Sequence, residues 1–145
     1  MRPSTVPAPH PVVIGYNGSP TAQRALVYAA GVARRAGRPL LIVHVTSPDV
    51  YCALMAAQAG GPAQDTGPLE HWLLAEFGRA ADADGLAVHA STRFGSPVRE
   101  LAVTAAEHDA DALVVGASRN FWRHPLGGLP ARLTAQARCP VIVVP

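Results

Sequence analysis

The most informative part of the sequence is Val12-Val13-Ile14-Gly15-Tyr16, together with the turn Asn17-Gly18-Ser19-Pro20 that follows it. Its apolar run without a charge is typical of a strand buried on both faces of a parallel sheet. Ser19 is a typical helix N-cap, and Pro20 suits the first helical position. Apolar residues then recur at helical spacing up to Gly37, a residue type that commonly ends a helix. A buried strand that leads through a short turn into an amphipathic helix predicts the opening of an α/β domain.

The alternation of strand and helix patterns continues to the end of the chain. Further strands are predicted at 40–45, 86–92, 112–116 and 140–144, and helices from Pro68 to about Gly85, after Ser96-Pro97, and at about 128–137. Strands that alternate with helices form parallel βαβ units with right-handed crossovers. The sequence therefore predicts a three-layer, Rossmann-like α/β fold, in which helices cover both faces of an open parallel five-stranded sheet. The strands at 12–16 and 112–116 are the most apolar, so we expect them at its centre.

The length of 145 residues suits one domain. Residues 1–11 hold four prolines and no apolar signal core, so we expect a flexible N-terminal tail and a cytoplasmic protein. Residues 12–145 are expected to form the single domain. Within it, residues 47–67 are long for a connection, which favours a variable loop with at most one short helix near 50–59. That loop follows a strand, so it is expected near the ligand site, either as a lid or disordered.

The composition excludes several classes of protein. All 12 basic residues are arginine, so sites that need a lysine are excluded: the Walker P-loop, the protein kinase site and the Schiff-base enzyme. The net charge of +2, with no basic cluster larger than Arg34-Arg35, argues against a nucleic-acid partner. No apolar run reaches the length of a membrane span, so no membrane partner is expected. Cys52 and Cys139 lack CxxC spacing and the histidines are scattered, so we expect free thiols and no metal site.

The sequence offers no set of catalytic residues, so we expect no enzyme activity beyond weak ATP hydrolysis. It contains neither a Gly-x-Ser-x-Gly elbow nor a Gly-x-Gly-x-x-Gly fingerprint after a strand. His44 falls within a predicted strand, where a packed and hydrogen-bonded histidine is commoner than a catalytic one. Asp109 and Asp111 flank the amino end of a strand, opposite the edge where ligands bind, and are interpreted as turn residues.

A ligand of an open parallel sheet binds beyond the carboxyl ends of the strands, where the strand order reverses. The loops after the two central strands are Asn17-Gly18-Ser19 and residues 116–128, and both carry glycine and lead into helix starts. Free N–H groups and the positive end of the helix dipole make such a start suitable for an anion. The pattern favours an anionic or nucleotide ligand between these loops, although glycines after strands also serve ordinary tight turns.

Several motifs, in order, resemble the universal stress protein family. They are Val13 to Pro20 with Arg24-Ala25-Leu26, Leu41 to Val45, Gly95-Ser96-Pro97-Val98, Val114 to Ser118, Gly127-Gly128, and Cys139 to Val144. The resemblance spans about residues 12–145. It implies a nucleotide-binding domain of Rossmann-like type, a homodimer commonly formed through the last strand, Val141–Val144, and a role in stress adaptation.

The family members that bind ATP carry Gly-x2-Gly-x9-Gly-Ser or Gly-Thr in the last third, and an aspartate after the first strand. This chain departs from that pattern. Asn17 stands at the aspartate position, Arg119 stands at the second glycine, and Gly127-Gly128 closes the motif two residues early and without a hydroxyl. The resemblance therefore implies a degenerate pocket for ATP or another adenine nucleotide as cofactor. Its expected residues are Gly15, Tyr16, Asn17, Ser19, Val45, Gly116, Ala117, Ser118, Arg119, Gly127, Gly128 and Leu129.

Two hypotheses follow from the degenerate motif and stay open. In the first, the protein is a stress-adaptation module that binds ATP or another nucleotide, because the positive side chains of Arg119, Arg123 and His124 suit a phosphate. In the alternative, it is a structural or interaction protein of the same fold that acts through protein partners. Phe121 and Trp122 would then close the pocket together with Arg119.

Overall fold

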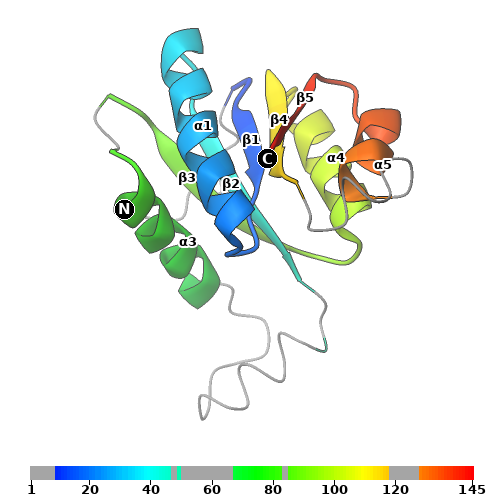
Figure 1. Ribbon diagram of the computed structural model, residues 1–145, viewed down its shortest axis with the longest axis horizontal. Helices are drawn as coiled ribbons and strands as arrows, with labels where there is room; N and C mark the ends of the chain where they lie inside the picture. The colour runs from blue at the N-terminus through cyan, green and yellow to red at the C-terminus, as the bar shows by residue number, and fades with distance from the viewer. Residues whose placement is uncertain (1–8, 47–48, 50–66, 83–84, 118–127) are drawn as a thin grey trace.

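The computed structural model describes residues 9–46, 49, 67–82, 85–117 and 128–145, and strands alternate with helices along them (Figure 1). The elements in chain order are β1 (Val12–Gly15), α1 (Pro20–Ala36), β2 (Leu40–Thr46), α3 (Gly67–Ala80), β3 (Val88–Phe94), α4 (Pro97–Glu107), β4 (Ala112–Gly116), α5 (Leu129–Gln136) and β5 (Val141–Val144). The N-terminal tail at 1–8 and the predicted helix near 50–59 lie outside the described residues.

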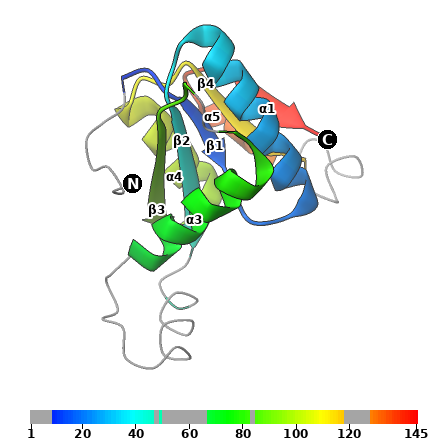
Figure 2. The same cartoon turned by 90° about the vertical axis from the view of Figure 1, so that its left-hand side faces the viewer.

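The five strands form one parallel sheet in the order β3-β2-β1-β4-β5. β1 lies at the centre, between β2 and β4, so the strand order reverses there. Helices α1 and α3 cover one face, and α4 and α5 cover the other (Figures 1 and 2). The predicted three-layer α/β fold is confirmed, and so is the central position of the strands at 12–16 and 112–116.

The ends of α1 follow the chemistry predicted for them. The Ser19 hydroxyl accepts a hydrogen bond from the Ala22 N–H at 3.1 Å, which satisfies one of the free donors of the first turn. Gly37 ends the helix with a φ of 65°, in the left-handed region that a glycine adopts without steric cost. The start of α4 differs: Ser96 occupies the N-cap position, but its side chain makes no capping hydrogen bond.

Two elements, β3 and α3, have boundaries that differ by more than one residue from the predicted positions. β3 runs from Val88 to Phe94, two residues later than predicted, because it pairs with β2 along that strand's whole length, from Leu40 to Thr46. Helix α3 ends at Ala80 rather than at Gly85. Gly85 has a φ of 68° and lies in the turn that leads into β3, so its left-handed backbone serves the turn and not the helix end.

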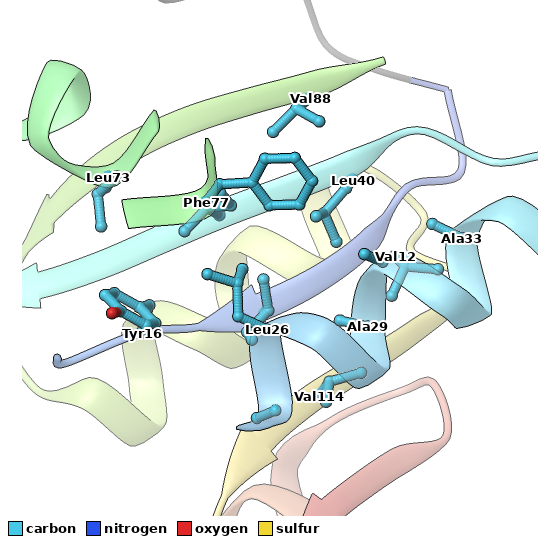
Figure 3. Packing of buried hydrophobic residues seen from close by; sticks show 14 of the residues in the cluster. Val12, Tyr16, Leu26, Ala29, Ala33, Leu40, Leu73, Phe77, Val88 and Val114 are labelled. Atoms are coloured by element: carbon cyan, nitrogen blue, oxygen red, sulfur yellow. The ribbon is translucent and has the colours of Figure 1, made fainter. Parts of the chain in front are cut away.

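The core consists of two apolar layers, one on each side of the sheet. Figure 3 shows the layer beneath α1 and α3, which includes Leu26 of α1, Phe77 of α3 and Leu40 of β2. Many alanines of the chain serve this layer, because small side chains let α1 lie close to the strands. The buried alanines of α1 are Ala22, Ala25, Ala29, Ala30 and Ala33. The opposite layer is formed largely by Val13, Leu41, Val43, Leu101, Leu113, Val115 and Leu133.

The described residues bear on the expectations about membrane spans, metal sites, free thiols and Asp109. None of the helices described is both long and apolar enough to cross a membrane. In the described ranges, no three or more His, Cys, Asp or Glu side chains gather where they could hold a metal ion. Cys139 is a half-buried free thiol, and Cys52 lies outside the described residues. Asp109 contacts His10 at the amino end of the sheet, in keeping with its interpretation as a turn residue.

Candidate functional site

The turn between β1 and α1 is held by its own polar groups. The Tyr16 N–H donates to the Val43 carbonyl at 2.9 Å, which continues the pairing with β2 one residue beyond the strand. The Asn17 side-chain oxygen accepts from the Ser19 N–H at 3.0 Å, a turn that short Asn side chains commonly close. Ser19 in turn caps α1 and lies 3.2 Å from the Thr21 hydroxyl. The turn is therefore fixed in place without a ligand.

The end of β4 lies directly against the first turn of α1. A Cβ at Gly116 would lie 2.7 Å from the Thr21 carbonyl carbon and 2.8 Å from the Ala22 nitrogen. Both are backbone atoms that cannot move aside, so only glycine fits this position. The next residue, Ala117, donates its N–H to the Val144 carbonyl at 2.7 Å. Gly116 thus has a packing role, in addition to any role in approaching a ligand.

A pocket of ≈ 610 Å³ opens at the carboxyl ends of β1, β2 and β4, where a ligand was expected. Eight predicted site residues line it: Gly15, Tyr16, Asn17, Ser19, Val45, Gly116, Ala117 and Leu129. Gly128 is the N-cap of α5 and is not among the lining residues. The predicted residues Ser118, Arg119 and Gly127 lie outside the described residues, as do Phe121, Trp122, Arg123 and His124.

Other lining residues were not predicted from the sequence. They are Pro20, Thr21, Ala22, Arg24, Val43, Pro97, Leu101, Val115 and Pro145. Pro97 opens the helix after β3, so its place at the carboxyl edge follows from the predicted topology and could have been found. Arg24 and Pro145 are 121 residues apart, and no local pattern relates them.

The apolar side chains of β2 and the charged side chain of Arg24 lie at different sides of the pocket. The side toward β2 is formed by Val43 and Val45, together with Pro97 at the start of α4. The side toward β5 carries Arg24, which donates from Nε to the Pro145 carbonyl at 2.9 Å. β2 and β4-β5 lie on opposite sides of β1, so the valines of β2 are separated from the end of β5, where Arg24 is held. Such a pocket suits an amphipathic ligand with a flat apolar part and an anionic part.

Tyr16 lines the pocket, and its side chain belongs to the apolar layer beneath α1 and α3 (Figure 3). Its hydroxyl donates to Glu76 Oε2 at 2.5 Å, and Glu76 also forms an ion pair with Arg79. Burial first, and then the Glu76 carboxylate, raise the pKa of Tyr16 to about 12. The hydrogen bonds from Tyr16 and Arg79 lower the pKa of Glu76. Both shifts favour the observed pair of a neutral phenol and a charged carboxylate.

His44 belongs to the same cluster. Its Nδ1 lies 2.9 Å from the Tyr16 carbonyl, and its ring meets Trp72 edge-on, with centroids 5.6 Å apart. The ring of Trp72 also packs against Tyr16 at 5.7 Å. His44 is thus a packed, hydrogen-bonded histidine, as interpreted from the sequence, and it supports the backbone that forms the pocket.

The chain is similar to one protein family and to several solved structures. The model of the universal stress protein family matches residues 9–145. A universal stress protein solved in complex with cAMP shares 23% identity and a TM-score of 0.68, over 94% of this chain and 97% of that one. A universal stress protein from Archaeoglobus fulgidus shares 22% identity and a TM-score of 0.66, over 93% of each chain.

A further structure, the Archaeoglobus fulgidus universal stress protein in complex with dAMP, shares 22% identity and a TM-score of 0.64, over 93% of this chain and 97% of that one. Among curated protein sequences, none matches the chain significantly. The family match covers nearly the whole chain, including β1, the pocket-forming turns and β5. This chain belongs to the universal stress protein family.

Proposed function

We propose that this protein is a cytoplasmic stress-adaptation module that binds an adenine nucleotide in the pocket between the β1–α1 turn and the end of β4. The observation that carries the proposal is the pocket itself, which lies at the reversal of strand order and is lined by eight of the residues expected from the family resemblance. Structural relatives of the chain have been solved with cAMP and with dAMP, which supports an adenine nucleotide as the ligand class.

The start of α5 supports an anionic ligand. Gly128 caps this helix without a side chain, so the cap residue itself supplies no side-chain hydrogen bond to the donors of the first turn. Leu129, the first helical residue, lines the pocket, while Pro130 contributes no N–H. Backbone donors and the positive end of the helix dipole together favour a phosphate there. This mode of binding needs no lysine, in keeping with a chain that has none.

Asn17 should bind the ribose of a nucleotide more weakly than an aspartate at the same position would. Its side-chain oxygen already accepts from the Ser19 N–H, and a neutral carboxamide lacks the charge that strengthens a hydrogen bond to a hydroxyl. We therefore propose nucleotide binding in a degenerate pocket, with weak hydrolysis at most.

We also propose that the protein forms a homodimer through β5. This strand lies at the edge of the sheet, it carries no charge, and each of its residues is partly exposed. An uncharged edge strand is a template for pairing, and a twofold axis would cover it in a closed dimer. Tyr28 and Val27 are also exposed on α1, the helix that packs beside β5, and they would extend such an interface.

Calorimetry tests nucleotide binding. ATP, ADP and AMP are titrated into nucleotide-stripped protein at low salt, with Val45→Arg as a variant that places a long charged side chain at the apolar side of the pocket. Val103→Arg, at an exposed position of α4, is the matched control. We expect binding to the wild type and the control, and loss of binding in Val45→Arg. No heat and no thermal shift at millimolar nucleotide would support the alternative of an interaction protein of the same fold.

A further inference from the structure

Arg24 is the one charged side chain among the described residues that line the pocket. It stands on the second turn of α1, in the same segment as Ser19 and Thr21. No acidic side chain appears in the described lining, and Asn17 is neutral where an aspartate would have offset the positive charge. Among the side chains of the described lining, Arg24 is therefore the one that carries a formal charge.

The guanidinium of Arg24 is oriented by a hydrogen bond from its Nε atom. Its Nε donates to the Pro145 carbonyl at 2.9 Å, which holds the side chain against the end of β5. Among the described residues this is its one hydrogen bond, and the ion pairs join other residues, so none of the described groups occupies the two Nη atoms. A guanidinium with a fixed direction and free donors suits a phosphate, because it offers parallel N–H groups to two oxygens.

The position of Arg24 relative to the apolar residues of the pocket indicates how a nucleotide would be oriented. Val43, Val45 and Pro97 form the apolar side toward β2, which suits a flat base. Arg24 and Pro145 lie on the far side of β1, toward β5 and near Leu129 at the start of α5. The phosphate would then meet a side-chain cation and a helix start at the same side of the pocket.

We propose that Arg24 binds the phosphate of the nucleotide, with the base on the side of Val43 and Val45. This inference rests on the proposed function. Arg24 then sets the preference of the pocket for nucleotides over nucleosides. It supplies the charge that the degenerate glycine motif and the neutral Asn17 do not.

The test combines removal of the phosphate from the ligand with replacement of the Arg24 side chain. AMP and adenosine are each titrated into the wild type, Arg24→Gln and Arg24→Lys. Arg34→Gln, an exposed arginine in the last turn of the same helix, is the matched control. We expect Arg24→Gln to weaken AMP binding about tenfold or more and to change adenosine binding by less than about twofold. Arg24→Lys keeps the charge without the fork, so its AMP affinity should lie between the two.

Three other outcomes distinguish a failure of the proposed role of Arg24 from a failure of the proposed function. If AMP binds Arg24→Gln as tightly as the wild type, the role of Arg24 is wrong and the proposed function stands. If AMP and adenosine weaken equally in Arg24→Gln, the residue acts only by holding Pro145, and the proposal is also overturned. If the wild type binds neither AMP nor adenosine, the proposed function fails and this inference fails with it. Circular dichroism and the melting temperature check that each variant is folded.

Discussion

The hydroxyl of Tyr16, just beyond the end of β1, donates a 2.5 Å hydrogen bond to Glu76 on α3, 60 residues away along the chain. Trp72, one turn earlier on α3, packs against the same tyrosine ring. Tyr16 also lines the pocket, and its side chain contacts α3. The position of α3 is therefore tied to the residue from which the turn at the pocket starts.

Removal of the Tyr16 hydroxyl should destabilise the fold. Tyr16→Phe keeps the ring against Trp72 but leaves the half-buried Glu76 carboxylate with one donor fewer, a cost of about 1–2 kcal/mol. Urea denaturation of the two proteins measures it. Tyr28→Phe, at an exposed position of α1, is the matched control and should change stability by less than about 0.5 kcal/mol. Equal stability of Tyr16→Phe and the wild type would contradict the hydrogen bond.

The same contact makes stability depend on alkaline pH. The pKa of Tyr16 is raised from 10.0 to about 12, so between these values the folded protein keeps a proton that the unfolded chain has lost. Its contribution to stability is therefore complete below pH 10 and is lost as the pH rises toward 12. The difference in tyrosinate absorbance between the wild type and Tyr16→Phe gives the titration of Tyr16 alone. A midpoint near 10 would show that burial and Glu76 do not act on this phenol.

Three glycines should differ in their tolerance of a methyl group. Gly116→Ala forces a Cβ against the backbone of Thr21 and Ala22, and should destabilise the fold by about 1–3 kcal/mol. Gly15→Ala meets the end of the Leu101 side chain at 2.8 Å, which can move, so it should cost less. Gly78→Ala, with no atom within 4 Å, should stabilise helix α3 by about 0.5–1 kcal/mol. Thermal melts rank the three variants, and a harmless Gly116→Ala would refute the close contact of β4 with α1.

The proposed dimer depends on the main chain of Val141 and Val143. Leu113 and Ala117 of the β4 segment donate to the carbonyls of Pro140 and Val144, and main-chain groups alternate in direction along a strand. The N–H groups of Val141 and Val143 therefore point away from β4, to the free edge. Val143→Pro removes an outward donor and is compatible with an edge strand. We expect a wild-type dimer and a folded Val143→Pro monomer in light scattering.

Two results of that experiment would contradict the dimer. A wild-type monomer at tens of micromolar protein would exclude pairing through β5 under those conditions. A Val143→Pro variant that remains dimeric would place the interface elsewhere, and the exposed Tyr28 and Val27 of α1 would then be the surface to change next.

Local sequence patterns predicted most of the fold. The apolar run at β1, the Ser19 cap and Gly37 fixed the first βα unit to within a residue, because each signal acts over one turn of chain. The third strand was placed two residues too early, because its ends are set by pairing with β2 and not by its own alternation. The end of α3 at Ala80 likewise has no strong local stop signal.

The sequence predicted those residues of the candidate site whose position follows from the strand order alone. Asn17, Ser19 and Ala117 lie at the carboxyl edge because parallel strands bring their ends together, so the topology placed them at the pocket. Arg24 and the pair of Tyr16 and Glu76 were missed for the opposite reason. Their partners are distant in sequence, and only the packing of α1 against β5 and of α3 against the sheet brings them into contact.

Amide chemical shifts of isotope-labelled protein, recorded during a titration with AMP, show whether a nucleotide binds in this pocket. We expect saturable changes that include Tyr16, Asn17, Ser19, Val45 and Ala117, the residues along the edge of the pocket. The amides of Arg34 and Arg35, at the far end of α1, should stay unchanged. An absence of change at millimolar AMP, or changes confined to a surface away from the pocket, would contradict nucleotide binding at this site.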